Sequence, residues 1–119
     1  MSRAILFVLI GLLTAPVFAD EADVVDVEAH RSGQTWSFDV TVRHADTGWD
    51  HYADKWDVVA PDGTVLATRT LYHPHVNEQP FTRSLGGVAI PDGIDTVTLR
   101  AHDSVHGYGG AELQVSLRR

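Results

Sequence analysis

Apolar and polar residues alternate with a period of two through most of the sequence after residue 20. Between Thr35 and Arg43, every second residue from Trp36 to Val42 is apolar, and the residues between them are polar or charged. Side chains of a β-strand point alternately to its two faces, so this pattern is typical of a strand with one buried face. No helical periodicity of useful length follows residue 20, and an all-β fold is expected.

Seven segments with this character are separated by short turns. The tripeptide Pro-Asp-Gly occurs at 61–63 and at 91–93, where proline presets one φ and glycine accepts a positive one. The pair Gly86-Gly87 predicts a bulge within its strand. We expect strands at residues 22–29, 35–43, 51–59, 64–71, 81–90, 96–102 and 112–117.

The fold class predicted from this series is all-β, a seven-stranded antiparallel sandwich after an N-terminal signal helix. With Trp56 in its third strand, the series resembles the immunoglobulin-like and fibronectin type III-like sandwiches. The chain contains no cysteine, and fibronectin modules also lack the disulfide of antibody domains. We expect a signal peptide at 1–19 and one sandwich domain at 20–119.

The first nineteen residues have the parts of a secretory signal peptide: Arg3 near the start, an apolar run over 4–13, and small residues up to Ala19. The apolar run is shorter than the ~20 residues that a membrane-spanning helix needs. A retained anchor is the alternative to cleavage. We expect cleavage after Ala19, which gives a periplasmic or secreted protein with no membrane span.

The net charge of the chain is −7 with histidine neutral, and loss of Arg3 makes it one unit more negative. Such a chain repels nucleic acid and anionic membranes and attracts cations or a basic partner, for example another exported protein. Cysteine is absent, and the one methionine is Met1. A transition-metal site in the mature protein would therefore depend on histidine.

Seven histidines are many for 119 residues. Consecutive strands of an antiparallel sandwich run in opposite directions, so alternate loops lie at the same end of the molecule. The connections near 44–51, 72–80 and 102–111 share one end, and they carry His44, His51, His73, His75, His102 and His106. Only His30 belongs to the other end, and we interpret His30 and His44 as surface or hydrogen-bonding residues.

The candidate metal ligands are therefore His51, His73, His75, His102 and His106. His51 and His102 are out of phase with the inward residues of their strands, so both should face away from the core on neighbouring strands, where side chains ~5 Å apart can share an ion. Imidazole binds copper(II) or zinc, either of which is the expected cofactor. Asp50, Asp103 and Glu78 are expected to complete the ligand shell or orient the rings.

Two other interpretations use the same loops. An aromatic platform of Trp49, Tyr52, Tyr72 and Tyr108 would bind a sugar, a peptide or a quaternary ammonium group. In the other, the histidines only satisfy loop carbonyls or sense pH. No catalytic motif, such as Gly-x-Ser-x-Gly or His-Glu-x-x-His, occurs in the sequence, so the expected protein is not an enzyme.

Three stretches, at 48–56, 73–81 and 102–110, resemble segments of a family of small exported bacterial proteins with no assigned role. The resemblance implies export and the sandwich fold and assigns no activity. The function predicted from the sequence is an exported β-sandwich that carries, buffers or senses a divalent metal ion, copper(II) or zinc, through its histidine-rich loops. The alternative is a non-metal module that recognises a protein, a peptide or a sugar through the same loops.

Overall fold

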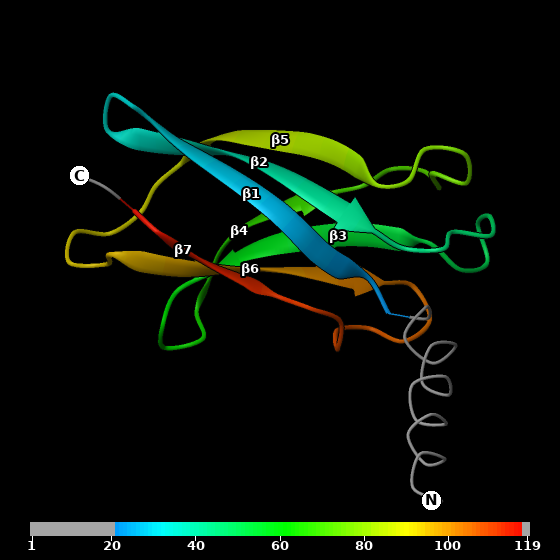
Figure 1. The fold of residues 1–119 in the computed structure, drawn as a ribbon. Helices are drawn as coiled ribbons and strands as arrows, with labels where there is room; N and C mark the ends of the chain where they lie inside the picture. The colour runs from blue at the N-terminus through cyan, green and yellow to red at the C-terminus, as the bar shows by residue number, and fades with distance from the viewer. Residues whose placement is uncertain (1–20, 118–119) are drawn as a thin grey trace, which may run out of the picture.

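In the computed structural model, residues 21–117 are described and form seven antiparallel strands in two facing sheets (Figure 1). One sheet has the order β1-β2-β5 and the other β4-β3-β6-β7. The predicted all-β sandwich of seven antiparallel strands is confirmed. The predicted signal peptide, its helix and its cleavage after Ala19 lie outside the described residues. The strands are β1 (Asp23–Ser32), β2 (Thr35–Arg43), β3 (Ala53–Val59), β4 (Val65–Thr70), β5 (Phe81–Val88), β6 (Thr96–Asp103) and β7 (Leu113–Ser116).

The core lies between the two sheets and follows the period-two pattern closely. In β2 the apolar residues Trp36, Phe38, Val40 and Val42 are at most 4% exposed, and the polar residues between them face outward. The opposite sheet contributes fully buried side chains from β3 and β6. These are Trp56, Val58, Val97, Leu99 and Ala101. Burial of these apolar surfaces, at roughly 25 cal/mol per Å², provides the main driving force for this fold.

The turn and bulge predictions are also confirmed. Gly63 and Gly93 have φ angles of 93° in the two Pro-Asp-Gly turns, a conformation that side chains with a Cβ rarely adopt. Trp36 pairs with Val88 and Phe38 pairs with Leu85, so β5 contains one extra residue at Gly86-Gly87. The bulge lies far from the histidine-rich loops.

The third strand begins at Ala53, two residues later than the sequence predicted. The chain from Thr47 to His51 forms a tight turn, in which Thr47 N donates to His51 O at 3.0 Å and His51 N donates to Gly48 O at 3.2 Å. His51 therefore precedes the strand, and the alternation of strand faces does not determine its direction. The expectation that His51 points away from the core is corrected on this ground.

One end of the sandwich, on the right in Figure 1, is formed by the loops at 44–52, 71–80 and 104–112. We call these three loops the histidine end. The third loop is tied to both sheets: the Tyr108 hydroxyl donates to Asp57 Oδ2 at 2.6 Å, and Val24 N donates to Ala111 O at 2.9 Å. This loop therefore has a fixed position relative to the ends of β1, β3 and β6.

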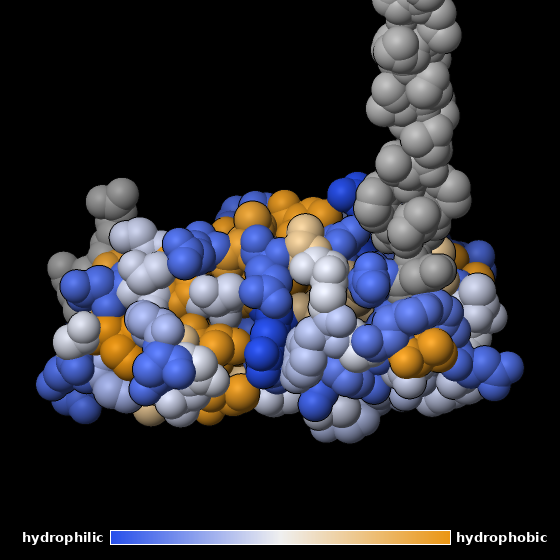
Figure 2. Space-filling view, turned by 90° about the horizontal axis from the view of Figure 1, so that it is seen from below, coloured by the Kyte–Doolittle hydropathy of each residue, from blue (hydrophilic) through white to orange (hydrophobic). Residues whose placement is uncertain are grey.

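Seen from below, the molecule presents hydrophilic side chains with apolar ones interspersed among them (Figure 2). The large apolar side chains that are most exposed within residues 21–117 lie mainly at the histidine end: Trp49, Tyr72, Val76 and Val105. Among residues 21–117, no helix is long and apolar enough to cross a membrane.

Candidate metal centre

Asp103, the last residue of β6, is the centre of a buried cluster at the histidine end. Its side chain is completely buried, and its Oδ1 accepts the backbone N–H groups of Val105 at 2.8 Å and of His106 at 2.5 Å. Asp103 and Gly107 also exchange two backbone hydrogen bonds of 3.0 Å, which closes a tight turn. These bonds hold the carboxylate in one orientation at the end of the strand.

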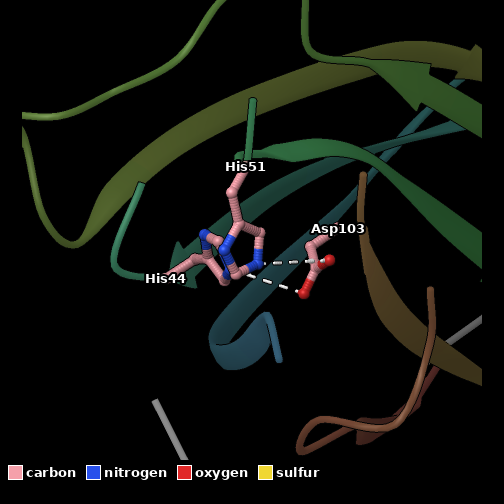
Figure 3. Close-up of side chains that lie close together, drawn as sticks. All are labelled: His44, His51 and Asp103. Carbon is pink, nitrogen blue, oxygen red and sulfur yellow. Dashed lines mark ion pairs between the residues drawn. The ribbon is translucent and has the colours of Figure 1, made fainter. Parts of the chain in front are cut away.

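Two histidines approach this carboxylate from the neighbouring loop (Figure 3). His44 Nε2 lies 3.4 Å from Asp103 Oδ2, and His51 Nε2 lies 3.5 Å from Asp103 Oδ1. The centroids of the two rings are 4.7 Å apart. One ligand atom from each of the three residues lies within 4.8 Å of the other two, close enough to hold one metal ion.

His106 adds a fourth group on the solvent side of the cluster. Its Nδ1 is 3.3 Å from Asp103 Oδ2, and its ring centroid is 4.8 Å from that of His51. The His106 side chain is 35% exposed, whereas the side chains of His44 and Asp103 are fully buried. The cluster is therefore closed towards the core and borders solvent at His106.

The donor geometry fits a metal ion. Two ligand atoms that are each ~2.1 Å from one ion at the tetrahedral angle lie about 3.4 Å apart, and the distances to Asp103 from His44, His51 and His106 are 3.3–3.5 Å. His51 Nε2 is also buried without a hydrogen-bond partner in the described part of the chain. Such an atom costs free energy unless a ligand or an ion occupies its lone pair. The site therefore has the donor set and spacing for one transition-metal ion.

A second buried carboxylate, Asp46, lies behind His44. Its Oδ1 is 2.5 Å from His44 Nδ1 and accepts the Ala53 N–H at 3.0 Å, and its Oδ2 accepts the His75 N–H at 2.7 Å. Burial acts to raise the pKa of Asp46, but these hydrogen bonds outweigh it and the pKa lies below its ordinary value. The carboxylate is therefore ionised at neutral pH.

The same two opposing effects, burial and hydrogen bonding, act on the pKa of Asp103. Burial acts to raise its pKa, but the backbone N–H groups of His106 and Val105, the His106 side chain and the nearby His44 together hold the pKa below its ordinary value. The cluster thus contains a permanent negative charge at neutral pH, which favours a cation between the rings.

The structure separates the five predicted ligands into three places. His51 and His106 lie in the cluster around Asp103. His73 is exposed, with its ring centroid 4.9 Å from that of the buried His75, whose ring stacks on Phe81 at 4.0 Å. His102 does not join His51, because its Nδ1 pairs with Asp54 Oδ1 at 2.6 Å and its ring contacts Tyr108. The ligand set as a whole stays a prediction.

The residues expected to support the ligands also differ in their placement. Asp103 lies at the centre of the cluster, whereas Glu78 pairs with Arg83 at 3.0 Å and Asp50 is exposed. In the predicted aromatic platform, Trp49 packs against Tyr52 with a centroid distance of 5.6 Å. Tyr72 is 74% exposed, and Tyr108 lies beside His102 and the Arg100 guanidinium.

Sequence reasoning missed His44 and Asp46. His44 was interpreted as a surface or hydrogen-bonding residue, as a lone histidine on a strand usually is, yet it is 2% exposed. The sequence His44-Ala45-Asp46 contained a clue, since a carboxylate two residues from a histidine often orients its ring. The alternation of β2 also continues past its last residue, because His44 and Asp46 are buried like Val42 and Ala45 is exposed like Arg43.

The stability of the metal-free protein is expected to fall below about pH 6.5, in part because of His75. Burial, with the nearby Arg83 and His73, holds the pKa of His75 below its ordinary value of 6.5. The unfolded chain therefore binds a proton that the folded chain does not, and the free energy of unfolding decreases as the pH drops through 6.5 towards the folded pKa.

The variant His75→Phe keeps the stacked ring and should remove this contribution, which approaches about 1.4 kcal/mol per pH unit. Urea unfolding between pH 7 and pH 5 measures it, with the exposed His30→Phe as the matched control. An unchanged slope in His75→Phe would contradict the prediction.

No family model matches the chain. A protein of Halomicrobium mukohataei described as a "putative lipoprotein" is 44% identical over 96 residues, which are 80% of this chain and 47% of that protein. The chain thus spans about half the length of this relative. Its description agrees with the resemblance to exported proteins and with the predicted export.

Solved structures share the fold at low identity. A hypothetical protein from Pyrococcus horikoshii superposes with a TM-score of 0.56 at 14% identity, over 85% of this chain and 92% of that one. A superoxide reductase in the oxidised state has a TM-score of 0.52 at 12% identity, over 83% and 90%. The superoxide reductase (neelaredoxin) of Archaeoglobus fulgidus has a TM-score of 0.52 at 13% identity, over 85% and 90%.

These similarities correct two predictions. The sequence predicted an immunoglobulin-like module for metal carriage, buffering or sensing, with a non-metal binding module as the alternative, but the sandwich is one that superoxide reductases share. The prediction that the protein is not an enzyme is contradicted by the same finding, because the named neighbours are reductases. The absence of a catalytic motif does not exclude an enzyme, because a site assembled from separate loops leaves no contiguous sequence pattern.

Proposed function

We propose that this protein is an exported redox enzyme that holds one iron ion at His44, His51 and Asp103 and reduces a small oxygen species such as superoxide. The observation that supports the proposal is the convergence of two imidazole nitrogens and one carboxylate at a single buried point. His106 is a further ligand on the solvent side of that point.

The donor set favours iron. Two histidines and one carboxylate with open positions are typical of non-haem Fe(II) sites. The two imidazole rings face the Asp103 carboxylate (Figure 3), and the fourth group, His106, is partly exposed, so a small molecule can approach from solvent. Copper(II) and zinc, which the sequence predicted, also bind imidazole and are the competing occupants.

The chain's own residues provide charge, orientation and exclusion of water. When bound, iron would supply one electron in passing from Fe(II) to Fe(III), and superoxide with that electron and two protons gives hydrogen peroxide. An external one-electron donor must then restore Fe(II). Asp103 stabilises the cation with a carboxylate that is fully buried and held by two backbone N–H groups. The burial of His44 and Asp103 strengthens these electrostatic interactions because bulk water is excluded.

Metal binding provides the first test. Without oxygen, Fe(II) at about one hundred times Kd should stabilise the chelator-treated protein by about 2.7 kcal/mol, which raises Tm by more than about 10 °C in a domain of this size. His51→Ala should lose most of this gain. His73→Ala removes an exposed histidine that lies outside the cluster around Asp103; it is the matched control and should keep the gain.

Activity provides the second test. The Fe(II)-loaded protein should consume superoxide and release one equivalent of hydrogen peroxide for each iron oxidised, and His51→Ala should not. Stopped-flow absorbance of superoxide with peroxide quantification measures this. A wild-type protein that gains no thermal stability from Fe(II), or one that binds it without reacting with superoxide, would overturn the proposal.

A further inference from the structure

Three parts of the chain meet at the Asp46 carboxylate. Its Oδ1 contacts the His44 ring and accepts the N–H of Ala53 at the start of β3, and its Oδ2 accepts the N–H of His75 in the loop at 71–80. The Asp46 side chain is completely buried. A buried carboxylate with this many directed contacts has essentially one orientation available to it.

His44 is held by the loop at 71–80 through its main chain as well. Gln79 accepts the His44 N–H through Oε1 at 2.9 Å, and its amide nitrogen donates to His75 O at 2.9 Å. Gln79 thus fixes the backbone of His44, and Asp46 contacts its ring. The ring position of His44 therefore depends on residues that lie outside the cluster around Asp103.

We infer that Asp46 is a positioning residue that fixes the protonated nitrogen of His44 at Nδ1, so that Nε2 presents its lone pair to the metal ion; this inference rests on the proposed function. The 2.5 Å separation between His44 Nδ1 and Asp46 Oδ1 requires a proton between the two atoms. The other ring nitrogen, Nε2, is directed at Asp103, 3.4 Å away.

The carboxylate also changes the strength of the ligand. A histidine that donates its second N–H to an anion is a more basic ligand than one that donates to water, and its ring cannot rotate away from the ion. Loss of such an outer partner typically weakens metal binding by roughly 10–100-fold. Asp46 and Gln79 both hold His44 from behind the cluster, Asp46 through the ring and Gln79 through the main chain.

The variant Asp46→Asn tests this inference with Co(II) as the probe, because Co(II) takes similar nitrogen and oxygen ligands and its visible spectrum reports their arrangement. Asparagine keeps an oxygen that can accept from His44 and Ala53 but removes the negative charge. We expect Co(II) to bind 10–100-fold more weakly, with a changed visible spectrum at saturation. Asp50→Asn removes an exposed carboxylate from the same loop and should leave the affinity and the spectrum as in the wild type.

The tautomer can be measured without any substitution. In the metal-free wild-type protein, ¹⁵N shifts should show that His44 Nδ1 carries a proton. This result decides the inference even where Asp46→Asn does not fold. An unprotonated Nδ1, or an Asp46→Asn protein that matches Asp50→Asn in affinity and spectrum, would overturn it. A wild type that binds no metal but shows the Nδ1 tautomer would overturn the proposed function and leave the positioning by Asp46 intact.

Discussion

Replacing Asp103 with alanine is expected to lower the free energy of unfolding of the metal-free protein by about 3–5 kcal/mol. The substitution leaves the N–H groups of Val105 and His106 without their acceptor and removes the buried charge that faces His44 and His51. Urea unfolding of the chelator-treated protein measures the loss.

The near-isosteric variant Asp103→Asn distinguishes the contribution of Asp103 to stability from its contribution to Fe(II) binding. Both backbone N–H groups donate to Oδ1, so an amide oxygen at that position retains them and most of the stability. The neutral amide should still weaken Fe(II) binding by more than the roughly 10–100-fold that loss of an outer partner costs. An Asp103→Ala protein that is as stable as the wild type would show that the carboxylate does not stabilise the fold. An Asp103→Asn protein with wild-type affinity would show that its charge does not contribute to Fe(II) binding.

The fold was predictable because strand alternation is local. The buried face of β2, which contains Phe38 and Val40, can be identified from the nine residues of the strand. Both Pro-Asp-Gly turns can be identified from their three residues. The differences lie at the ends of strands, where hydrogen bonds within the loops decide the residue at which a strand begins. His51 was placed in a strand, but the turn at Thr47–His51 delays β3 until Ala53.

The candidate site was predictable only in its location. Strand direction alone gathers His44, His51 and His106 at one end, as the sequence indicated. Which rings converge depends on features that the sequence does not display. Ala53 pairs with Asp103 and Lys55 pairs with His102, so Asp54 is an extra residue in β3. Beside this bulge His102 pairs with Asp54 rather than with the cluster, while Asp103 keeps its inward direction.

Gly110 is a position where a single methyl group is expected to disturb both the fold and the metal site. A Cβ at this residue would lie 2.7 Å from the carbonyl carbon of Ala22 and closer still to its oxygen. These are backbone atoms at the start of β1, next to the hydrogen bond between Val24 N and Ala111 O. Neither segment can move without loss of that bond and of the one from Ala111 N to Asp23.

We therefore expect Gly110→Ala to lower the free energy of unfolding by about 3 kcal/mol, which is the upper end of the usual range for overpacking. For a domain of this size, this loss lowers Tm by at least about 12 °C. Because the displaced loop contains His106, Fe(II) affinity should fall as well. Gly86→Ala is the matched control. It adds the same methyl group to β5, where the Ser37 Cβ at 3.9 Å is the nearest neighbour and φ is not positive, so Tm should hardly change. Equal melting temperatures for the two variants would mean that the loop at 104–112 has room to move, and that the hydrogen bonds of Ala111 with β1 do not fix the position of His106.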